Sequence, residues 1–231
     1  MLQACLNGAR APGSHPALPL TPRALAGDAR AVAAAGARSL HLHPRDASGA
    51  ETLEAADVAA ALVAVRAAAP GVEISLSTGE WIAPDREALI AQWTELPELV
   101  SLNLSERGWQ SVAALLGMRG IGIEAGLSTV EDAEALVASA LQPVRVLVEI
   151  DDEALGGEEA VARAAAIDAV LDDRAPRLHH AMGPGTWAVI AAAAARGIDA
   201  RIGLEDVLVL PDGTPAPGNE ALVRAALDVV G

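Results

Sequence analysis

His41 and His43 are the two residues of this sequence whose types and spacing most directly suggest chemistry. They stand two positions apart in a short apolar run, and residues i and i+2 of a strand project from the same face. Both imidazoles could therefore bind one metal ion, with a carboxylate as third ligand and a coordination position left open for catalysis. Glu205, which follows the last apolar run, is the best placed carboxylate. The alternative is that the two histidines only hydrogen-bond neighbouring loops.

Arg201, Glu205 and Asp206 form a second group of chemically useful side chains. A guanidinium beside a carboxylate keeps that carboxylate ionised and oriented, which a base for proton abstraction requires. The alternative interpretation is a salt bridge that only closes the fold.

Other apolar runs also end in polar residues. Ser77, Thr78 and Gly79 could offer hydroxyls and backbone N–H groups to a substrate carboxylate, since glycine allows close approach. Ser101, Asn103 and Glu124 stand at the ends of the next two runs. His179 and His180 are adjacent on a later run, so they point to opposite faces and at most one can reach a shared site.

The elements that must position these residues alternate regularly along the chain. Short apolar runs predict eight strands: Leu2–Asn7, Ser39–His43, Glu73–Ser77, Leu99–Asn103, Gly122–Ala125, Arg145–Glu149, Arg177–His180 and Ala200–Gly203. Alanine-rich segments predict the helices that follow them: Arg23–Ala35, Glu54–Ala68, Asp85–Trp93, Gln110–Met118, Thr129–Ala140, Gly157–Asp172, Thr186–Arg196 and Asn219–Val230. Ser128, with Glu131 three residues on, predicts one helix cap.

This count predicts an α/β fold, a (β/α)8 TIM barrel formed by residues 1–231 as a single domain. A doubly wound sheet is the alternative. In a barrel, catalytic residues lie at the C-terminal ends of the strands. The polar residues named above fall at those ends, which supports a shared site.

Composition excludes several classes of protein. The chain has 231 residues, a net charge of −15 and no lysine, phenylalanine or tyrosine. Schiff-base aldolases, pyridoxal-phosphate enzymes and P-loop NTPases need a lysine amine and are excluded. Nucleic acid and anionic membranes are poor partners for so acidic a chain. The single Cys5, and the lack of a signal peptide or a long apolar stretch, lead us to expect a soluble cytoplasmic protein.

Six motifs in this order resemble those of the β-keto acid cleavage enzymes, a family that includes enzymes acting on 3-keto-5-aminohexanoate. They are Asn-Gly-Ala at 7–9, His-Pro-Ala-Leu-Pro-Leu-Thr-Pro at 15–22, His-Leu-His-Pro-Arg-Asp at 41–46, Ser-Thr-Gly at 77–79, Ser-Leu-Asn at 101–103 and Arg-Ile-Gly-Leu-Glu-Asp at 201–206. The resemblance extends from about residue 4 to residue 228.

The resemblance implies a zinc-dependent barrel that converts a β-keto acid and acetyl-CoA into a new acyl-CoA and acetoacetate. By similarity, the Zn²⁺ or another divalent metal is held by His41, His43 and Glu205. Asp206, aligned by Arg201, is the expected base that makes the acetyl-CoA enolate, and Glu124 matches the strand-five acid of the family. Ser77 and Ser101 are expected to anchor the substrate carboxylate, within a substrate site that also includes Thr78, Gly79, Asn103 and Arg10. We also expect a homo-oligomer, a dimer or a tetramer.

Arg10 departs from the family pattern, since the aminohexanoate-cleaving enzymes have a glutamate at this position. A guanidinium facing the pocket would repel an ammonium group and could hold a carboxylate. We therefore expect a neutral or dicarboxylic β-keto acid as substrate. An Arg10 that turns outward, or that meets a phosphate of coenzyme A, is the alternative.

Two other functions remain open from the sequence. A divalent-metal aldolase or hydrolase could use the same ligands without coenzyme A. A barrel of another class would be a non-catalytic metal-binding or assembly protein. Stoichiometric metal would separate the enzymes from a barrel that has lost its chemistry, and consumption of acetyl-CoA would separate the two enzymes.

Overall fold

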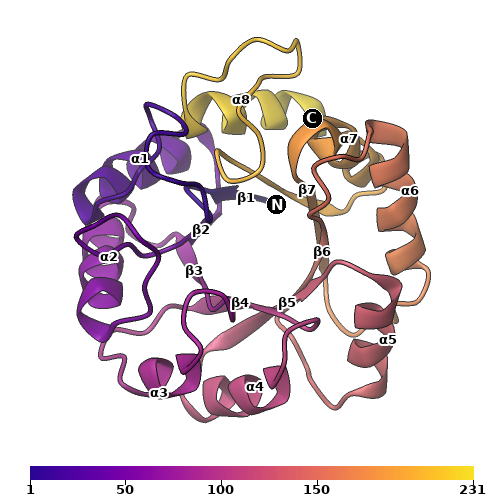
Figure 1. The fold of residues 1–231 in the computed structure, drawn as a ribbon. Helices are drawn as coiled ribbons and strands as arrows, with labels where there is room; N and C mark the ends of the chain where they lie inside the picture. Colours follow the sequence, from indigo (N-terminus) through magenta and orange to yellow (C-terminus); the bar gives the residue numbers. More distant parts are fainter.

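Eight parallel strands close into a barrel, in sequence order, in the computed structural model of residues 1–231 (Figure 1). The strands are β1 (Leu2–Cys5), β2 (Ser39–Leu42), β3 (Glu73–Ser77), β4 (Leu99–Asn103), β5 (Gly122–Leu127), β6 (Arg145–Ile150), β7 (Arg177–Ala181) and β8 (Asp199–Ile202). The helices around them are α1 (Pro22–Ala35), α2 (Ala55–Ala68), α3 (Arg86–Ala91), α4 (Trp109–Met118), α5 (Val130–Ala138), α6 (Gly157–Asp168), α7 (Thr186–Ala195) and α8 (Asn219–Val230), with a short 3-10 helix, η1 (Gly183–Gly185). The predicted (β/α)8 barrel is confirmed, and the doubly wound alternative is wrong because β1 pairs with β8.

The two faces of the barrel sheet differ in chemistry. The side-chain amide of Gln3 donates hydrogen bonds to Ser39 and to Glu124 on other strands, so these three residues lie inside the barrel. The alternate residues, such as Leu40 and Leu42, face the other way and belong to the large apolar core between sheet and helices. The apolar core therefore lies between sheet and helices, while polar groups occupy the barrel interior.

The cap of α5 lies one residue later than predicted. The hydroxyl of Thr129 accepts a hydrogen bond from the Asp132 N–H, and the Asp132 carboxylate accepts one from the Thr129 N–H. This reciprocal pair satisfies the first turn of the helix, and aspartate replaces the glutamate of the usual pattern.

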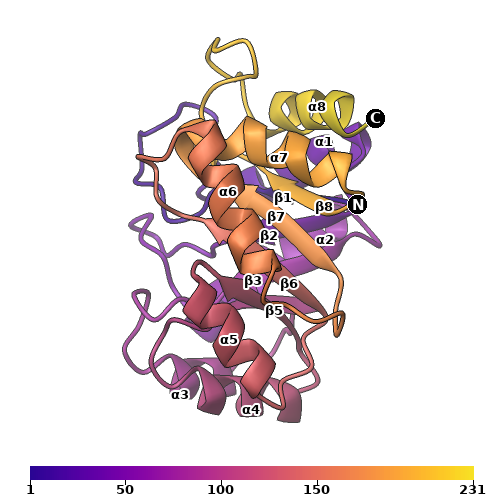
Figure 2. The same ribbon diagram turned by 90° about the vertical axis from the view of Figure 1, so that its right-hand side faces the viewer.

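Both chain termini lie at the end of the barrel opposite the longer loops (Figure 2). His43 comes directly after β2 and Glu205 shortly after β8, so both belong to the C-terminal ends of strands. No helix combines the length and the apolar character required to cross a bilayer.

Candidate functional site

Three potential metal ligands converge at the C-terminal ends of β2 and β8. The Nε2 atoms of His41 and His43 lie 3.0 Å apart. Glu205 faces both rings, with its Oε2 3.9 Å from His41 Nε2 and its Oε1 3.7 Å from His43 Nε2. One ligand atom from each residue lies within 4.8 Å of the others. The structure thus brings together the three residues that the sequence suggested as ligands.

Residues that follow β1 hold two of these ligands in place. The side-chain oxygen of Asn7 accepts from the backbone N–H of His43, and its amide donates to the His43 carbonyl, both at 2.9 Å. Gly8 has a φ of 56°, and a Cβ built on it would lie 2.2 Å from the Cγ of Glu205. Glycine is therefore needed here both for the left-handed backbone and for the space that Glu205 occupies.

The outer nitrogens of both imidazoles have partners. His43 Nδ1 lies 2.5 Å from Oε1 of Glu51, and His41 Nδ1 lies 3.4 Å from the Ser75 hydroxyl. A partner at Nδ1 fixes the ring so that Nε2 faces the site, as is usual for metal-binding histidines. Burial holds the pKa of His41 well below its ordinary value, aided by the charge of Arg201. A neutral imidazole keeps the lone pair that a metal requires.

The two carboxylate oxygens of Glu205, the third potential ligand, differ in their hydrogen bonding. Oε1 of Glu205 accepts a hydrogen bond from Arg201, whereas Oε2 is buried and has no hydrogen-bond partner. Leaving a buried carboxylate oxygen unsatisfied is costly, and a cation in front of it would remove that cost. Two imidazole nitrogens and one carboxylate oxygen are a donor set that suits zinc and similar divalent ions. The residues present therefore fit a divalent metal.

These ligands face a cavity of about 230 Å³. Its wall includes seven residues singled out from the sequence: His41, His43, Ser77, Ser101, Asn103, Arg201 and Glu205. It also includes six that were not assigned to the site: Ala9, Trp81, Glu149, Asp151, His180 and Met182. Thr78, Gly79, Arg10, Glu124 and Asp206 do not line it.

Glu124 lies deeper inside the barrel than the cavity. Its oxygens accept hydrogen bonds from Gln3 and Ser75, and Arg145 forms an ion pair with it at 3.2 Å. Because the Ser75 hydroxyl lies between Glu124 and His41 Nδ1, Glu124 contacts the metal site only through that hydroxyl.

Three other residues of the expected substrate site have internal partners. The Arg10 guanidinium donates to the backbone carbonyls of Leu204 and Asp206. The Thr78 hydroxyl donates to the Ser101 carbonyl at 2.7 Å. Gly79 gives room to Trp81, whose ring would lie 2.4 Å from a Cβ at that position.

Asp206 is fully buried, and its neighbours account for both oxygens. Oδ2 lies 2.6 Å from the Cys5 sulfur and Oδ1 lies 3.2 Å from His180 Nδ1. The other ring nitrogen of His180 lies 3.2 Å from Oε2 of Glu149. His180 thus joins a buried carboxylate to one that lines the cavity.

The charges of this group depend on one another. Burial and Arg201 lower the pKa of His180, but hydrogen bonds to Asp206 and Glu149 outweigh them and raise it to about 8. Burial raises the pKa of Asp206, yet the hydrogen bond and charge of His180 hold it below its ordinary value. Burial, with the charge of Asp206, raises the pKa of Cys5, which keeps the sulfur a thiol donor.

Part of this group could have been found from sequence. Glu149 and His180 stand at the ends of predicted strands, where barrel enzymes place functional side chains. Alternation already required that only one of His179 and His180 face inward; in the structure His179 faces Asp168 instead, at 3.2 Å. Glu51 and Trp81 come from loops, and no spacing in the sequence signals them.

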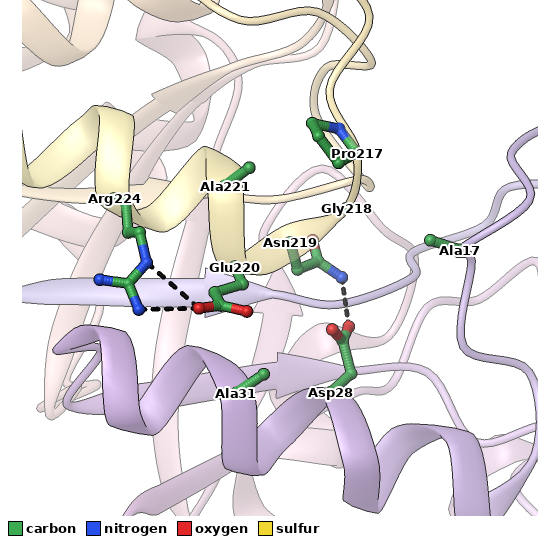
Figure 3. Close-up of a pocket in the computed structure, with 9 residues that line it drawn as sticks. All are labelled: Ala17, Asp28, Ala31, Pro217, Gly218, Asn219, Glu220, Ala221 and Arg224. Atoms are coloured by element: carbon green, nitrogen blue, oxygen red, sulfur yellow. Dashed lines mark hydrogen bonds and ion pairs between the residues drawn. The ribbon is translucent and has the colours of Figure 1, made fainter.

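A network behind the site supports the strand end that carries Glu205. At the start of α8, Asn219 accepts a hydrogen bond from the Leu204 N–H at 2.6 Å and donates to the Leu6 carbonyl at 2.7 Å. Its amide also donates to Asp28 of α1 at 2.5 Å, in a surface pocket between α1 and α8 (Figure 3). Asn219 therefore ties the ends of β1 and β8 to each other.

The chain is similar to one known protein family over its whole length. The chain matches the family model described as beta-keto acid cleavage enzyme over residues 1–150 and again over residues 127–231. The chain belongs to this family. Together the two matches cover every strand and helix described above.

Solved structures similar to this family member share its barrel. The apo structure of ObcA superposes with a TM-score of 0.73 at 18% identity, and the match covers 92% of this chain and 61% of ObcA. The type I 3-dehydroquinate dehydratase of Clostridium difficile gives 0.64 at 10% identity, covering 99% and 90%. The (S)-3-O-geranylgeranylglyceryl phosphate synthase of Thermoplasma acidophilum gives 0.60 at 14%, covering 99% and 92%. The chain thus spans about three-fifths of the length of ObcA, and these likenesses show the fold alone.

Proposed function

We propose that this chain is a β-keto acid cleavage enzyme that uses a divalent metal, zinc in the first instance, and acetyl-CoA as co-substrate. It would convert a small β-keto acid and acetyl-CoA into an acyl-CoA and acetoacetate. The observation that carries the proposal is the donor set of His41, His43 and Glu205, which faces a cavity from two strand ends. Family membership supports the class of reaction.

The substrate carboxylate is assigned to other polar residues of the same cavity. Ser77, Ser101 and Asn103 line the cavity and offer two hydroxyls and an amide. Arg201 also lines it, and a guanidinium can donate hydrogen bonds to an anionic oxygen. A cavity of about 230 Å³ suits a small acid, since sites for drug-sized ligands run from about 300 Å³ upward.

Each residue then has a separate task. A bound divalent ion would supply a Lewis acid for the ketone oxygen of the keto acid. Arg201 holds Glu205 in position through Oε1. Asp206 provides the buried carboxylate of the proton-transfer group, and Glu124 supports His41 from below through Ser75.

Cleavage without coenzyme A is the second candidate, and the side-chain contacts of three arginines that follow β1, β2 and β3 favour it. Arg10, Arg45 and Arg86 all donate to backbone carbonyls. The chain has no lysine to bind the phosphates of coenzyme A. A divalent-metal aldolase or hydrolase would need no such contacts.

The test uses protein stripped of metal and then reloaded with zinc, manganese or nothing. Neutral, dicarboxylic and amino-bearing β-keto acids are supplied with and without acetyl-CoA, and acetoacetate is measured. We expect acetoacetate only when metal, keto acid and acetyl-CoA are all present. Cleavage of the keto acid at the same rate without acetyl-CoA would support the second candidate, and stoichiometric metal without any turnover would point to a binding protein.

A further inference from the structure

His180 lies between the cavity and Asp206. It stands near the end of β7, lines the cavity and is 3% exposed. Its Nδ1 lies 3.2 Å from Asp206 Oδ1, and its Nε2 lies 3.2 Å from Glu149 Oε2. The ring therefore has one nitrogen on a buried carboxylate and the other on a carboxylate of the cavity wall.

Asp206 itself has no open approach from the cavity. Its exposed fraction is 0%, it does not line the cavity, and the Cys5 thiol and the His180 ring take its two oxygens. A base must come within hydrogen-bond reach of the proton that it removes. A substrate carbon could reach Asp206 only by displacing one of these two neighbours.

We infer that His180 is the residue that exchanges a proton with the keto acid, and that Asp206 is a positioning residue that acts through it. The inference rests on the proposed function and changes two assignments of the sequence analysis: the base is His180 instead of Asp206, and the keto acid instead of acetyl-CoA loses the proton. A carboxylate at Nδ1 holds an imidazole in one orientation and tautomer and leaves Nε2 to do chemistry. When substrate binds, it takes the place of Glu149 at Nε2.

The proton balance of the reaction needs only one such group. In the neutral ring, whose one proton stays on Nδ1 toward Asp206, Nε2 takes a proton from the carbon between the ketone and the carboxylate, and the C–H electron pair stays on that carbon. This carbon bonds to the acetyl carbonyl and the coenzyme A thiolate leaves. The thiolate then adds to the original ketone carbon, and the bond between that carbon and the former methylene carbon breaks. Acyl-CoA is released, and Nε2–H returns its proton to the carbon, which gives acetoacetate.

The matched variants are His180→Ala and His179→Gln. His179 is the neighbouring residue on β7 but faces Asp168 outside the site, so its replacement reports damage to the strand alone. We expect His180→Ala to lose about 10²–10⁴-fold in kcat, with metal content unchanged, and added imidazole to restore part of the loss. His179→Gln should keep the wild-type kcat. Glu149→Gln should lose less than tenfold, since substrate displaces Glu149.

Two assays separate this inference from the proposed function. The first measures acetoacetate with acetyl-CoA; the second follows exchange of the keto acid methylene hydrogens in D₂O without acetyl-CoA, above the spontaneous rate. Loss of both activities in His180→Ala, with imidazole rescue, is the expected result. A second outcome is that the wild type exchanges hydrogens but makes no acetoacetate, and that His180→Ala loses the exchange. This result would keep the inference and reject the acetyl-CoA reaction. The inference would be overturned if His180→Ala kept the wild-type kcat. It would also be overturned if Glu149→Gln were inactive and imidazole failed to rescue His180→Ala. A wild type inactive in both assays would reject both proposals.

Discussion

Oε1 of Glu51 lies 2.5 Å from Nδ1 of His43. Burial raises the pKa of this carboxyl, but the hydrogen bond and charge of His43 hold it below its ordinary value, so it remains an anion. An anionic partner at Nδ1 makes the imidazole a better ligand through Nε2 and fixes its orientation. The second carboxylate oxygen of Glu51 accepts a hydrogen bond from the indole N–H of Trp81 at 3.1 Å, so Glu51 links His43 to a residue that lines the cavity.

Replacing Glu51 by glutamine should therefore weaken metal binding by about 10–100-fold, the usual cost of losing such a partner. Competition with a chromophoric chelator measures the affinity. Glu54→Gln is the control, because Glu54 is exposed, three residues on, and makes no side-chain cap bond. Equal affinities for wild type and Glu51→Gln would show that Glu51 does not support a metal ligand.

Gly8→Ala should displace Glu205. The new Cβ would overlap the Glu205 side chain at 2.2 Å, on top of a left-handed backbone with a φ of 56°. Gly13 is the matched control: its φ is 87°, but nothing lies within 4 Å of a Cβ there. Each variant should lose roughly 1–2 kcal/mol of unfolding free energy for the backbone alone.

Only Gly8→Ala should also lose metal affinity, by at least about tenfold. Chelator competition and urea unfolding of the two variants separate the two effects. Metal affinity that falls equally in Gly13→Ala and Gly8→Ala would mean that general strain, rather than the position of Glu205, explains the loss.

Asp28 should make stability depend on pH. Burial, against the hydrogen bond from Asn219, raises its pKa from 3.8 to about 6. As pH rises from about 4 to 6, the unfolded chain gives up this proton before the folded protein does, so the free energy of unfolding falls. Above pH 6 the unfolding free energy lost through the ionisation of Asp28 no longer changes, and this loss is at most about 3 kcal/mol.

Asp28→Asn removes this titration and can still accept the Asn219 hydrogen bond through its amide oxygen. The stability of the variant relative to wild type should rise between pH 4 and 6 and then stay level, as measured by urea unfolding. Asp228→Asn, an exposed change in α8, should show no such rise. A difference independent of pH would contradict the raised pKa of Asp28.

Asn7→Ala should destabilise the protein and loosen His43. It removes two hydrogen bonds to the His43 backbone and one to the Pro19 carbonyl, all from a fully buried side chain. Buried groups left unpaired cost about 1–3 kcal/mol each, so a loss of about 2–4 kcal/mol is expected by urea unfolding. Asn7→Asp, which keeps the acceptor for the His43 N–H, should retain more of the stability than Asn7→Ala. A loss below about 1 kcal/mol in Asn7→Ala would show that these three hydrogen bonds contribute little to the stability of the protein.

The alternation of apolar runs and alanine-rich segments was enough to predict the barrel, and the i, i+2 spacing was enough to place two imidazoles on one face. The sequence does not predict how deep inside the barrel a given side chain lies. Ser77, Ser101, Glu124 and Arg145 are consecutive register partners, yet the first two line the cavity while Glu124 lies below it. Tilted strands carry such a row from the mouth toward the floor, and the stagger that sets this slope has no local sequence signal.

Side-chain direction past a strand end was equally hidden. Glu205 and Asp206 are neighbours in a turn after β8, where strand alternation no longer applies. Glu205 faces the histidines, whereas Asp206 turns toward Cys5 and His180. Two residues from other parts of the chain set these directions. Gly8, after β1, leaves the space that Glu205 occupies, and Asn219, at the start of α8, accepts a hydrogen bond from the Leu204 N–H.

The fate of the acetyl group distinguishes the proposed reaction from cleavage without coenzyme A. Metal-loaded protein is given an unlabelled β-keto acid and acetyl-CoA that carries carbon-13 in its acetyl group, and the products are followed by NMR. We expect acetoacetate to carry the label in its methyl and ketone carbons, the new acyl-CoA to be unlabelled, and removal of the metal to abolish both products. Unlabelled cleavage products beside intact labelled acetyl-CoA, or label transfer that persists without metal, would contradict the proposed reaction.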